Sequence, residues 1–166
     1  MLPRMLKGFT VYIDGRGYIG RVDSAKPPPL SLVTEAYRGA GMDAEIDIDM
    51  GMQKLDFSCV LADYDPEVIK LFGLFSADTA IVLRGAFQRQ GEAAIPVVIR
   101  LQGGVKSLDR DDWSQGKRAN ITFLANCNRY SEEINGVKVV DIDILNGVRI
   151  IDGVDQLASI RAALGV

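Results

Sequence analysis

Alternation of apolar and polar residues with a period of two is the feature that most constrains how this chain can fold. Phe9, Val11 and Ile13 alternate with polar or smaller neighbours, and residues 55–61 and 121–127 repeat the pattern. Successive side chains of a strand point to opposite faces, so the alternation predicts strands with one buried and one wetter face. The Val- and Ile-rich residues 79–84 and 95–101 fit strands with both faces partly covered.

Turn signals separate these strands. Asp14-Gly15 is expected to end the first strand, with residues 18–22 returning as its partner. The prolines at 27–29 lack N–H groups and predict an extended segment that cannot pair, followed by a strand over 30–37. Asn135-Gly136, between residues 130–134 and 137–145, is the strongest hairpin signal of the chain.

Two short helices are predicted. Asp65 can cap the first, with Pro66 at its first position and Gly73 at its end. The second is expected over 154–164, capped by Asp152 or Asp155 and ended by Gly165. The apolar faces are Val68, Leu71 and Phe72 in the first, and Leu157, Ile160 and Leu164 in the second. The pattern predicts a mostly β chain, a β-sandwich or barrel-like body with one or two short flanking α-helices, in a single domain over 1–166.

Two segments are expected to leave this body as excursions, one at about residues 36–54 and a polar one at about 107–118 that contains Trp113. In the first, acidic residues occupy alternate positions and would share one face if the segment were extended. These residues are Asp43, Glu45, Asp47 and Asp49, with Met42, Ala44, Ile46, Ile48 and Met50 on the other face. Such a row would either repel a polyanion or meet a basic patch on a neighbouring copy, for example Arg38, Arg84, Arg100 or Arg149.

The residues that usually carry catalysis are scarce. The chain has no His, which removes the commonest general base and metal ligand. Cys59 and Cys127 alternate with polar residues and are expected to be small buried side chains. Gly15, Gly17 and Gly20 match a dinucleotide fingerprint literally, but no helix is predicted after them. Alternate carboxylates on a strand lie about 6.5–7 Å apart, which suits neither paired-carboxylate catalysis nor a calcium site. We therefore expect no enzyme, no cofactor and no metal.

Charge and hydropathy set limits on partners and location. The net charge is -3, so the chain lacks the excess of Lys and Arg that accompanies bulk attraction to nucleic acid. No apolar run approaches the roughly 20 residues that cross a bilayer, and the first residues do not resemble a secretion signal. We expect the chain to be made in the cytosol, and we expect no membrane anchoring.

Five ordered blocks spread along the chain resemble the major tail tube protein family of contractile-tailed phages and phage-tail-like bacteriocins. They are MLPR (1–4) with DGRGYIG (14–20), EAYRGAGMDA (35–44), EIDIDMGMQKL (45–55), YDPEVIKLFG (64–73), and NGVR (146–149) with GVDQL (153–157) and Arg161. The resemblance implies a tail tube fold whose copies form hexameric rings that stack into a hollow tube in the virion tail, assembled in the host cytoplasm. It implies as partners the chain itself, a sheath protein, a tape-measure protein, a baseplate initiator and transiently passing DNA.

Two sets of residues follow as expectations for assembly. The glycines and methionines of the first excursion predict contacts between subunits and between stacked rings, through Tyr37, Arg38, Gly39, Gly41, Met42, Asp43, Met50 and Met52. Carboxylates that keep DNA from adhering are expected to face the lumen, from among Asp47, Asp49, Asp56, Asp141 and Asp143.

Three other interpretations remain open. A tube protein of a type six secretion system would share the architecture. A β-sandwich module that binds carbohydrate or peptide would need an exposed aromatic platform, for which this chain offers few aromatic residues and a single Trp. An acid-dependent hydrolase would need two close carboxylates in a cleft. The sequence also leaves open whether the particle is an infectious phage, a defective prophage or a bacteriocin.

Overall fold

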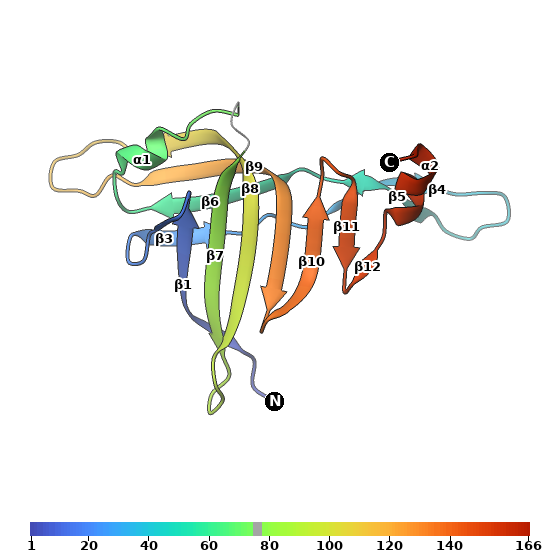
Figure 1. Ribbon diagram of the computed structural model, residues 1–166, viewed down its shortest axis with the longest axis horizontal. Coiled ribbons are helices and arrows are strands. Elements are labelled where there is room, and N and C mark those ends of the chain that lie inside the picture. The colour runs from blue at the N-terminus through green and yellow to red at the C-terminus, as the bar shows by residue number, and fades with distance from the viewer. Residues whose placement is uncertain (75–77) are drawn as a thin grey trace.

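The computed structural model describes residues 1–74 and 78–166 (Figure 1). The elements, in chain order, are β1 (Met5–Ile13), β2 (Arg16–Gly17), β3 (Val22–Lys26), β4 (Leu32–Tyr37), β5 (Ile46–Met52), β6 (Leu55–Leu61), α1 (Pro66–Ile69), β7 (Thr79–Gln88), β8 (Ile95–Arg110), β9 (Ile121–Ile134), β10 (Val137–Asp143), β11 (Val148–Ile151), β12 (Val154–Asp155) and α2 (Ala158–Leu164).

Two long strands, β8 and β9, run through both layers of the body. Their paired ends near residues 95–102 and 129–134 join β7, β1 and β2 on one side and β10, β11 and β12 on the other. We call this layer the front sheet. Their other ends pair with each other while β9 also pairs with β6, and β6 pairs with β3, which gives the back sheet. In Figure 1 the back-sheet strands β3 and β6 run across behind the front sheet.

The core lies between the facing sides of the two sheets. Every second residue of β6 is buried, including Phe57 and Cys59, and these pair with the equally buried Phe123 and Ala125 of β9. The front sheet contributes a row of directly opposed, buried residues across five strands, namely Ile13, Ile81, Leu101, Tyr130 and Ile142. Each large apolar side chain buried in this way stabilises the fold by about 1.5–3 kcal/mol. The predicted mostly β, sandwich-like fold with short helices is confirmed.

The change from one sheet to the other coincides with a bulge in β9, where Asn128 is the extra residue opposite Gln102 and Gly103 of β8. The register between β8 and β9 shifts between Gln102 and Gly103, and a Cβ atom at Gly103 would lie 2.1 Å from the carbonyl oxygen of Asn126. Only glycine permits this close approach of the two backbones. The bulge lets a single pair of strands bend from the front sheet into the back sheet.

Most predicted strands are present, and several are longer than predicted. Residues 55–61 form β6, and the hairpin between β9 and β10 turns at Asn135 and Gly136, with φ values of 51° and 79°. Both positive values are those of the tight turn that Asn-Gly favours. The strand predicted over 95–101 continues to Arg110, so the first residues of the polar excursion 107–118 pair with β9. Only the loop after Arg110 leaves the sheet.

The predicted return strand over 18–22 is wrong. Only Arg16 and Gly17 pair with β1, and Tyr18 turns into the core, where its hydroxyl donates a 2.9 Å hydrogen bond to Oδ2 of Asp65. Burial is the main cause that raises the pKa of Tyr18 to about 12, and this hydrogen bond is the second cause. The chain then crosses to the other layer, where Val22 begins β3. Burial of an aromatic ring outweighed the local hairpin signal.

The two helices are short. Asp65 caps α1 as predicted, since its Oδ1 accepts a 2.9 Å hydrogen bond from the Glu67 N–H. However, α1 ends at Ile69, and Gly73 instead bonds the carbonyl oxygen of Val105. Helix α2 begins after Leu157 without a side-chain cap and ends at Gly165 in the left-handed conformation, as predicted. Within the described residues, neither helix has the length and apolarity that a membrane span requires.

Candidate assembly surfaces

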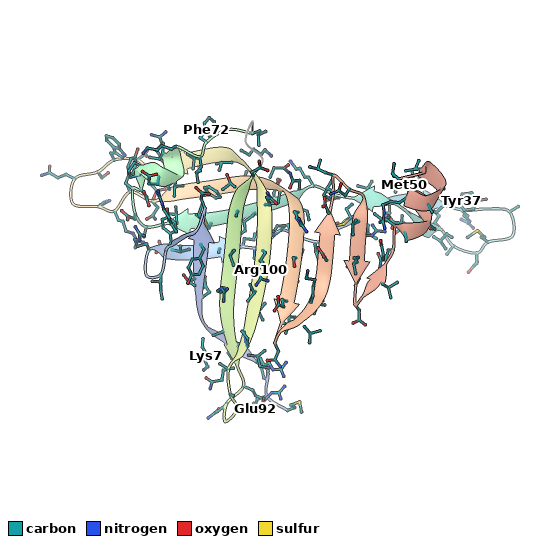
Figure 2. All side chains as sticks on the ribbon, viewed as in Figure 1. Lys7, Tyr37, Met50, Phe72, Glu92 and Arg100 are labelled. Atoms are coloured by element: carbon teal, nitrogen blue, oxygen red, sulfur yellow. The ribbon has the colours of Figure 1, made fainter. Side chains whose placement is uncertain are left out.

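Residues 32–52 fold as a separate two-stranded sheet that we call the arm, made of β4, β5 and the loop 38–45 between them. The arm contains most of the excursion predicted at 36–54. β4 and β5 pair with each other and with no other strand in the described parts of the chain. In Figure 1 the arm extends beyond the front sheet at the end where α2 and the C-terminus lie, and Figure 2 shows Tyr37 and Met50 on it. A hairpin without a covering layer is marginally stable in water, so this one has surface available for another partner.

The tip of the arm is held by its own backbone. The Met42 N–H donates to the carbonyl oxygen of Gly39 at 3.2 Å, and the Gly39 N–H lies 3.1 Å from the sulfur of Met42. Nε of Arg38 donates to the carbonyl oxygen of Met42. Gly41 has a φ of +86°, which favours glycine, and Gly39 lies under the Tyr37 ring. The structure thus brings Tyr37, Arg38, Gly39, Gly41 and Met42 together.

The acidic row of the arm is shorter than predicted. β5 begins at Ile46, so Asp43 and Glu45 lie in the loop and only Asp47 and Asp49 share a face of the strand. The opposite face carries Ile46 and Ile48, which are exposed together with Met50. The turn through Gly41 ends the extended conformation that the prediction required.

The two methionines of β5 have different surroundings. Met50 is exposed, whereas Met52 is partly buried and packs against the core at the root of the arm. Of the two methionines expected to contact neighbouring subunits, Met50 is thus on the surface of the single chain, and Met52 is mostly covered by its own core. Met52 is the last residue of β5, close to the start of β6 at Leu55. The apolar core therefore includes a residue at the base of the arm.

An ion pair fixes the arm to the front sheet. Nη2 of Arg149, on β11, donates a 2.7 Å hydrogen bond to Oδ2 of Asp49. Arg149 is only 8% exposed, and its Nε has no hydrogen-bond partner among the described residues. The Gly51 N–H, which bonds Asp49, and then Arg149 lower the pKa of the Asp49 carboxyl. Arg149, one of the arginines considered as a partner on a neighbouring copy, thus pairs with an acid of the arm in the same chain.

The front sheet has an open strand edge at each end. β1 pairs with β2 only at Tyr12 and Ile13, so within the described chain its outer edge from Met5 to Thr10 has no strand partner. At the other end, β12 covers β11 with two residues only. Unpaired edges of this length attract another strand, and proteins cover or close them. The sequence pattern did not indicate which strands would lie at the edges, because edge position depends on the order of strands in the sheet.

The outer face of the front sheet carries nearly balanced charges. Arg100, at the centre of this face in Figure 2, bonds Glu133 at 2.9 Å, and Lys138 lies 3.4 Å from Asp141. Arg129 and Asp143 are directly opposite each other across β9 and β10. Hydrogen bonds from Asn146, and further the Arg129 charge, hold the pKa of Asp143 below its usual value. Most basic groups here therefore have a carboxylate close by.

The five aspartates that were candidates for the lumen lie on three different surfaces. Asp141 and Asp143 are on the outer face of the front sheet, and Asp47 and Asp49 are on the arm. Asp56 is on the outer face of the back sheet, where it bonds Asn126 and lies near Lys54 and Lys106. Burial acts to raise the pKa of Asp56, but Asn126 and the two lysines outweigh it and the pKa is lowered.

Metal-ligating and reactive side chains are dispersed in the described part of the chain. Within it, no three His, Cys, Asp or Glu side chains are placed to hold a metal ion. Cys59 and Cys127 are buried, and burial raises the pKa of each thiol to about 12, which leaves them as unreactive core residues. Trp113 is exposed and contacts Tyr64 edge-on, with the ring centres 6.1 Å apart.

Comparison with known proteins agrees with this geometry. Residues 3–165 match the model of the family described as phage tail tube protein FII. The chain is 31% identical over 172 residues to the tail tube protein of Escherichia phage P2, covering 99% of each chain. It is 27% identical over 154 residues to the major tail tube protein of Serratia phage KSP20, covering 92% of this chain and 90% of the relative.

Solved structures share the fold at low sequence identity. A sheath/tube terminator of the extracellular contractile injection system PVC has a TM-score of 0.60 at 12% identity, covering 80% of this chain and 98% of the other. The PVC sheath-tube complex gives 0.57 at 12% identity, over 75% and 87% of the two chains. The tube-terminating cap of the anti-feeding prophage gives 0.56 at 14% identity, again over 75% and 87%. A match over almost the whole length, on a sheet with two open edges and a projecting arm, shows that this chain belongs to the phage tail tube protein FII family.

Proposed function

We propose that this chain builds the inner tube of a contractile phage tail or tail-like particle, with six copies closing into a ring and the rings stacking into a hollow conduit. The observation that carries the proposal is the pair of open edges on the front sheet, β1 at one end and β11–β12 at the other. An edge of one copy that pairs with the opposite edge of the next gives a head-to-tail contact, and such a contact closes into a ring when the rotation permits.

The two faces of the front sheet suit the two sides of a tube wall. One face is apolar and packs against the back sheet, while the other carries paired charges such as Arg100 with Glu133. If the charged face lines the channel, Asp141 and Asp143 are the aspartates that face the lumen, and Asp56, on the opposite side of the body, is not. A surface whose basic groups are already neutralised offers few sites where DNA can displace counterions.

The tube would assemble with partners that supply its start, length and cover. A baseplate initiator would template the first ring, a tape-measure protein would fill the lumen until DNA passes, and a sheath protein would cover the outside. Assembly would take place in the host cytoplasm and the finished tube would lie in the virion tail. The arm residues Tyr37, Arg38, Gly39, Gly41, Met42, Asp43 and Met50 would contact neighbouring subunits or rings, and Met52 would anchor the arm.

Negative-stain electron microscopy of the purified chain, alone and with the initiator complex, tests the proposal. Rings or tubes of uniform diameter with six-fold averaged end views are the expected result. A chain that stays monomeric in both conditions, over a range of concentration and salt, would overturn it. Tubes with a rotational symmetry other than six would retain the tube and correct the copy number.

A further inference from the structure

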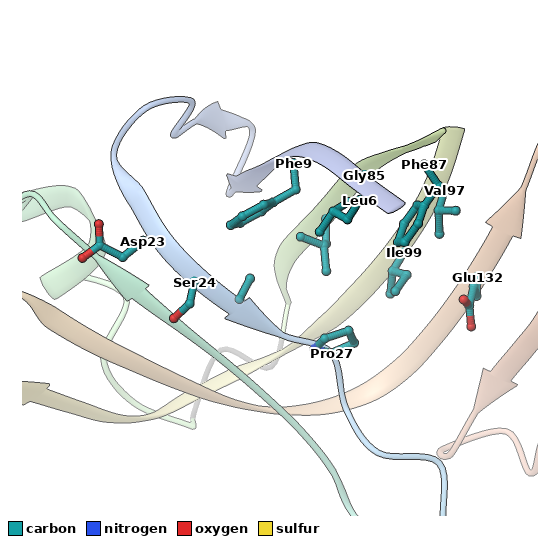
Figure 3. A pocket seen from close by; sticks show the side chains of 12 residues that line it. Leu6, Phe9, Asp23, Ser24, Pro27, Gly85, Phe87, Val97, Ile99 and Glu132 are labelled. Carbon is teal, nitrogen blue, oxygen red and sulfur yellow. The ribbon is translucent and has the colours of Figure 1, made fainter. Parts of the chain in front are cut away.

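An apolar groove lies beneath the front sheet next to its β1 edge (Figure 3). It has a volume of about 440 Å³ and is lined mainly by Leu6, Phe9, Phe87, Val97 and Pro27. These front-sheet side chains point to the same side as the core, since Leu6 opposes Phe87 and Phe9 opposes Gly85 across β1 and β7. The back sheet ends at β3 and leaves this part of the apolar face uncovered. The groove thus continues the core to the surface.

Two lysines are chain neighbours of residues that line the groove, while the charged side chains in the lining itself are acidic. Lys7 follows Leu6 and Lys26 precedes Pro27, and neither has a carboxylate within 4 Å among the residues that the structure describes. Of the two acids that line the groove, Asp23 pairs with Arg118 at 2.6 Å and Glu132 accepts a 2.8 Å hydrogen bond from the Tyr130 hydroxyl. An occupant that combines apolar side chains with negative charge would match the apolar lining and would lie near the two lysines.

The arm has this combination. One face of β5 exposes Ile46, Ile48 and Met50, and the same segment carries Asp43, Glu45 and Asp47, which make no ion pair in the described part of the chain. Seven residues of strand extend about 23 Å, long enough to lie along a groove of this size. Its apolar side chains lack a covering layer, as does the groove.

Geometry excludes the chain's own arm as the occupant. The groove lies beside β1, whereas the arm leaves the body at the other end of the front sheet, next to β11 and α2 (Figure 1). The arm continues directly into β6, so it lies level with the back sheet. A second copy with its β11–β12 edge beside β1 therefore carries its arm behind β1, where the groove opens.

We infer that the groove is the receptor for the arm of the neighbouring copy in the same ring, with Ile46 and Ile48 against Leu6, Phe9 and Phe87 and the arm carboxylates near Lys7 and Lys26. This inference rests on the proposed function, and it adds which surface the arm occupies. The contact is heterologous, because each copy gives its arm in one direction and receives one from the other.

Cross-linking between two variants, each with one added exposed cysteine, tests the contact. Ile48→Cys and Leu6→Cys proteins are mixed in equal amounts, assembled and treated with a short bis-maleimide. The native Cys59 and Cys127 are buried and contribute little background. We expect a cross-linked dimer in the mixture and at least about tenfold less product from either variant alone. As a control, Met5→Cys replaces Leu6→Cys, since Met5 is on the opposite face of the same strand.

Charge substitution tests the same contact without a cross-linking reagent. Leu6→Glu places a carboxylate among the arm's acids, and the matched control is Met5→Glu. The two side chains are 48% and 59% exposed in the single chain, so neither change should prevent folding. We expect Leu6→Glu to raise the protein concentration needed for assembly at least about tenfold, and Met5→Glu to change it less than about threefold.

The outcomes separate the inference from the proposed function. Suppose that tubes form, that Ile48→Cys and Leu6→Cys give no cross-link, and that Leu6→Glu assembles like Met5→Glu. The inference is then wrong and the tube function stands. If the arm cysteine cross-links to Met5→Cys instead, the arm occupies another surface and the inference is also wrong. If the unsubstituted chain forms neither rings nor tubes, the proposed function itself fails.

Discussion

Arg149 on β11 donates a 2.7 Å hydrogen bond to Asp49 on β5, a residue one hundred positions earlier in the chain. The pair joins the arm to the front sheet, and the two side chains differ in their access to water. Arg149 is almost fully buried, whereas the Asp49 side chain is 42% exposed. Loss of the carboxylate therefore leaves a buried cation without its counter-charge, which is the costly way to break such a pair.

We predict that Asp49→Ala lowers the free energy of unfolding, because it leaves the buried Arg149 guanidinium without its counter-charge. The loss should be smaller than for a fully buried pair, because Asp49 is partly solvated. The substitution should also increase hydrogen exchange in β5, because the Gly51 N–H loses its acceptor. Urea denaturation and exchange mass spectrometry measure the two effects. Asp47→Ala, on the same face of the strand, is the control and should change stability by less than about 0.5 kcal/mol. Equal effects of both substitutions would contradict the role given to the pair.

The same pair predicts a pH dependence. The folded-state pKa of Asp49 is lowered below the ordinary value of 3.8, so the ion pair contributes fully above pH 3.8 and is lost as pH falls through the lower folded value. The stability difference between the wild-type chain and Asp49→Ala should be constant from pH 8 to 5 and should shrink below pH 3.8. Denaturation of both proteins across this range is the measurement. A difference that persisted undiminished at pH 2 would show that the carboxylate charge is not its source.

A third prediction concerns Gly103 of β8, opposite the bulge where β8 and β9 pass from one sheet to the other. A methyl group at Gly103 would meet the Asn126 carbonyl oxygen at 2.1 Å and the Cys127 Cα at 2.7 Å, so the paired backbones would have to separate. Gly103→Ala should cost at least about 2 kcal/mol. Gly8→Ala adds the same methyl group to β1, where no atom lies within 4 Å, and should cost less than about 0.5 kcal/mol. Thermal denaturation of the pair checks this, and similar values for both would refute it.

A fourth prediction concerns the charged face of the front sheet. Asp141→Lys with Asp143→Lys removes two carboxylates that neutralise Lys138 and Arg129, and it adds two cations on the proposed lumen face. Tubes of this variant should retain short duplex DNA at low salt, with retention falling steeply as salt rises. Sedimentation of labelled DNA with assembled tubes measures it.

The control for this experiment is Asp111→Lys with Asp112→Lys, which makes the same charge change in the exposed loop after β8. These tubes should retain DNA only on their outside, where a nuclease removes it. DNA in the first variant should be protected. Equal nuclease sensitivity in both would place Asp141 and Asp143 outside the lumen.

Local sequence patterns were sufficient to predict most of the secondary structure of this protein. Alternation at residues 55–61 gave β6 with its buried face, Asn135-Gly136 gave the hairpin, and Asp65 with Pro66 gave the start of α1. These are effects between near neighbours in the chain, where side-chain direction and turn conformation follow from residue type. The family could be identified for a related reason, since its blocks are contiguous stretches of sequence.

The edge strands, the anchor of the arm and the grouping of the aspartates could not be predicted from local patterns and are seen only in the folded chain. The predicted strand over 18–22 was lost because burial of Tyr18 is a long-range effect that no local pattern contains. Asp49 could have met any arginine in the chain or a neighbour, and the order of strands selected Arg149. Strand order depends on how the whole apolar surface is buried at once. Residues that are distant in sequence are brought into contact only by that arrangement.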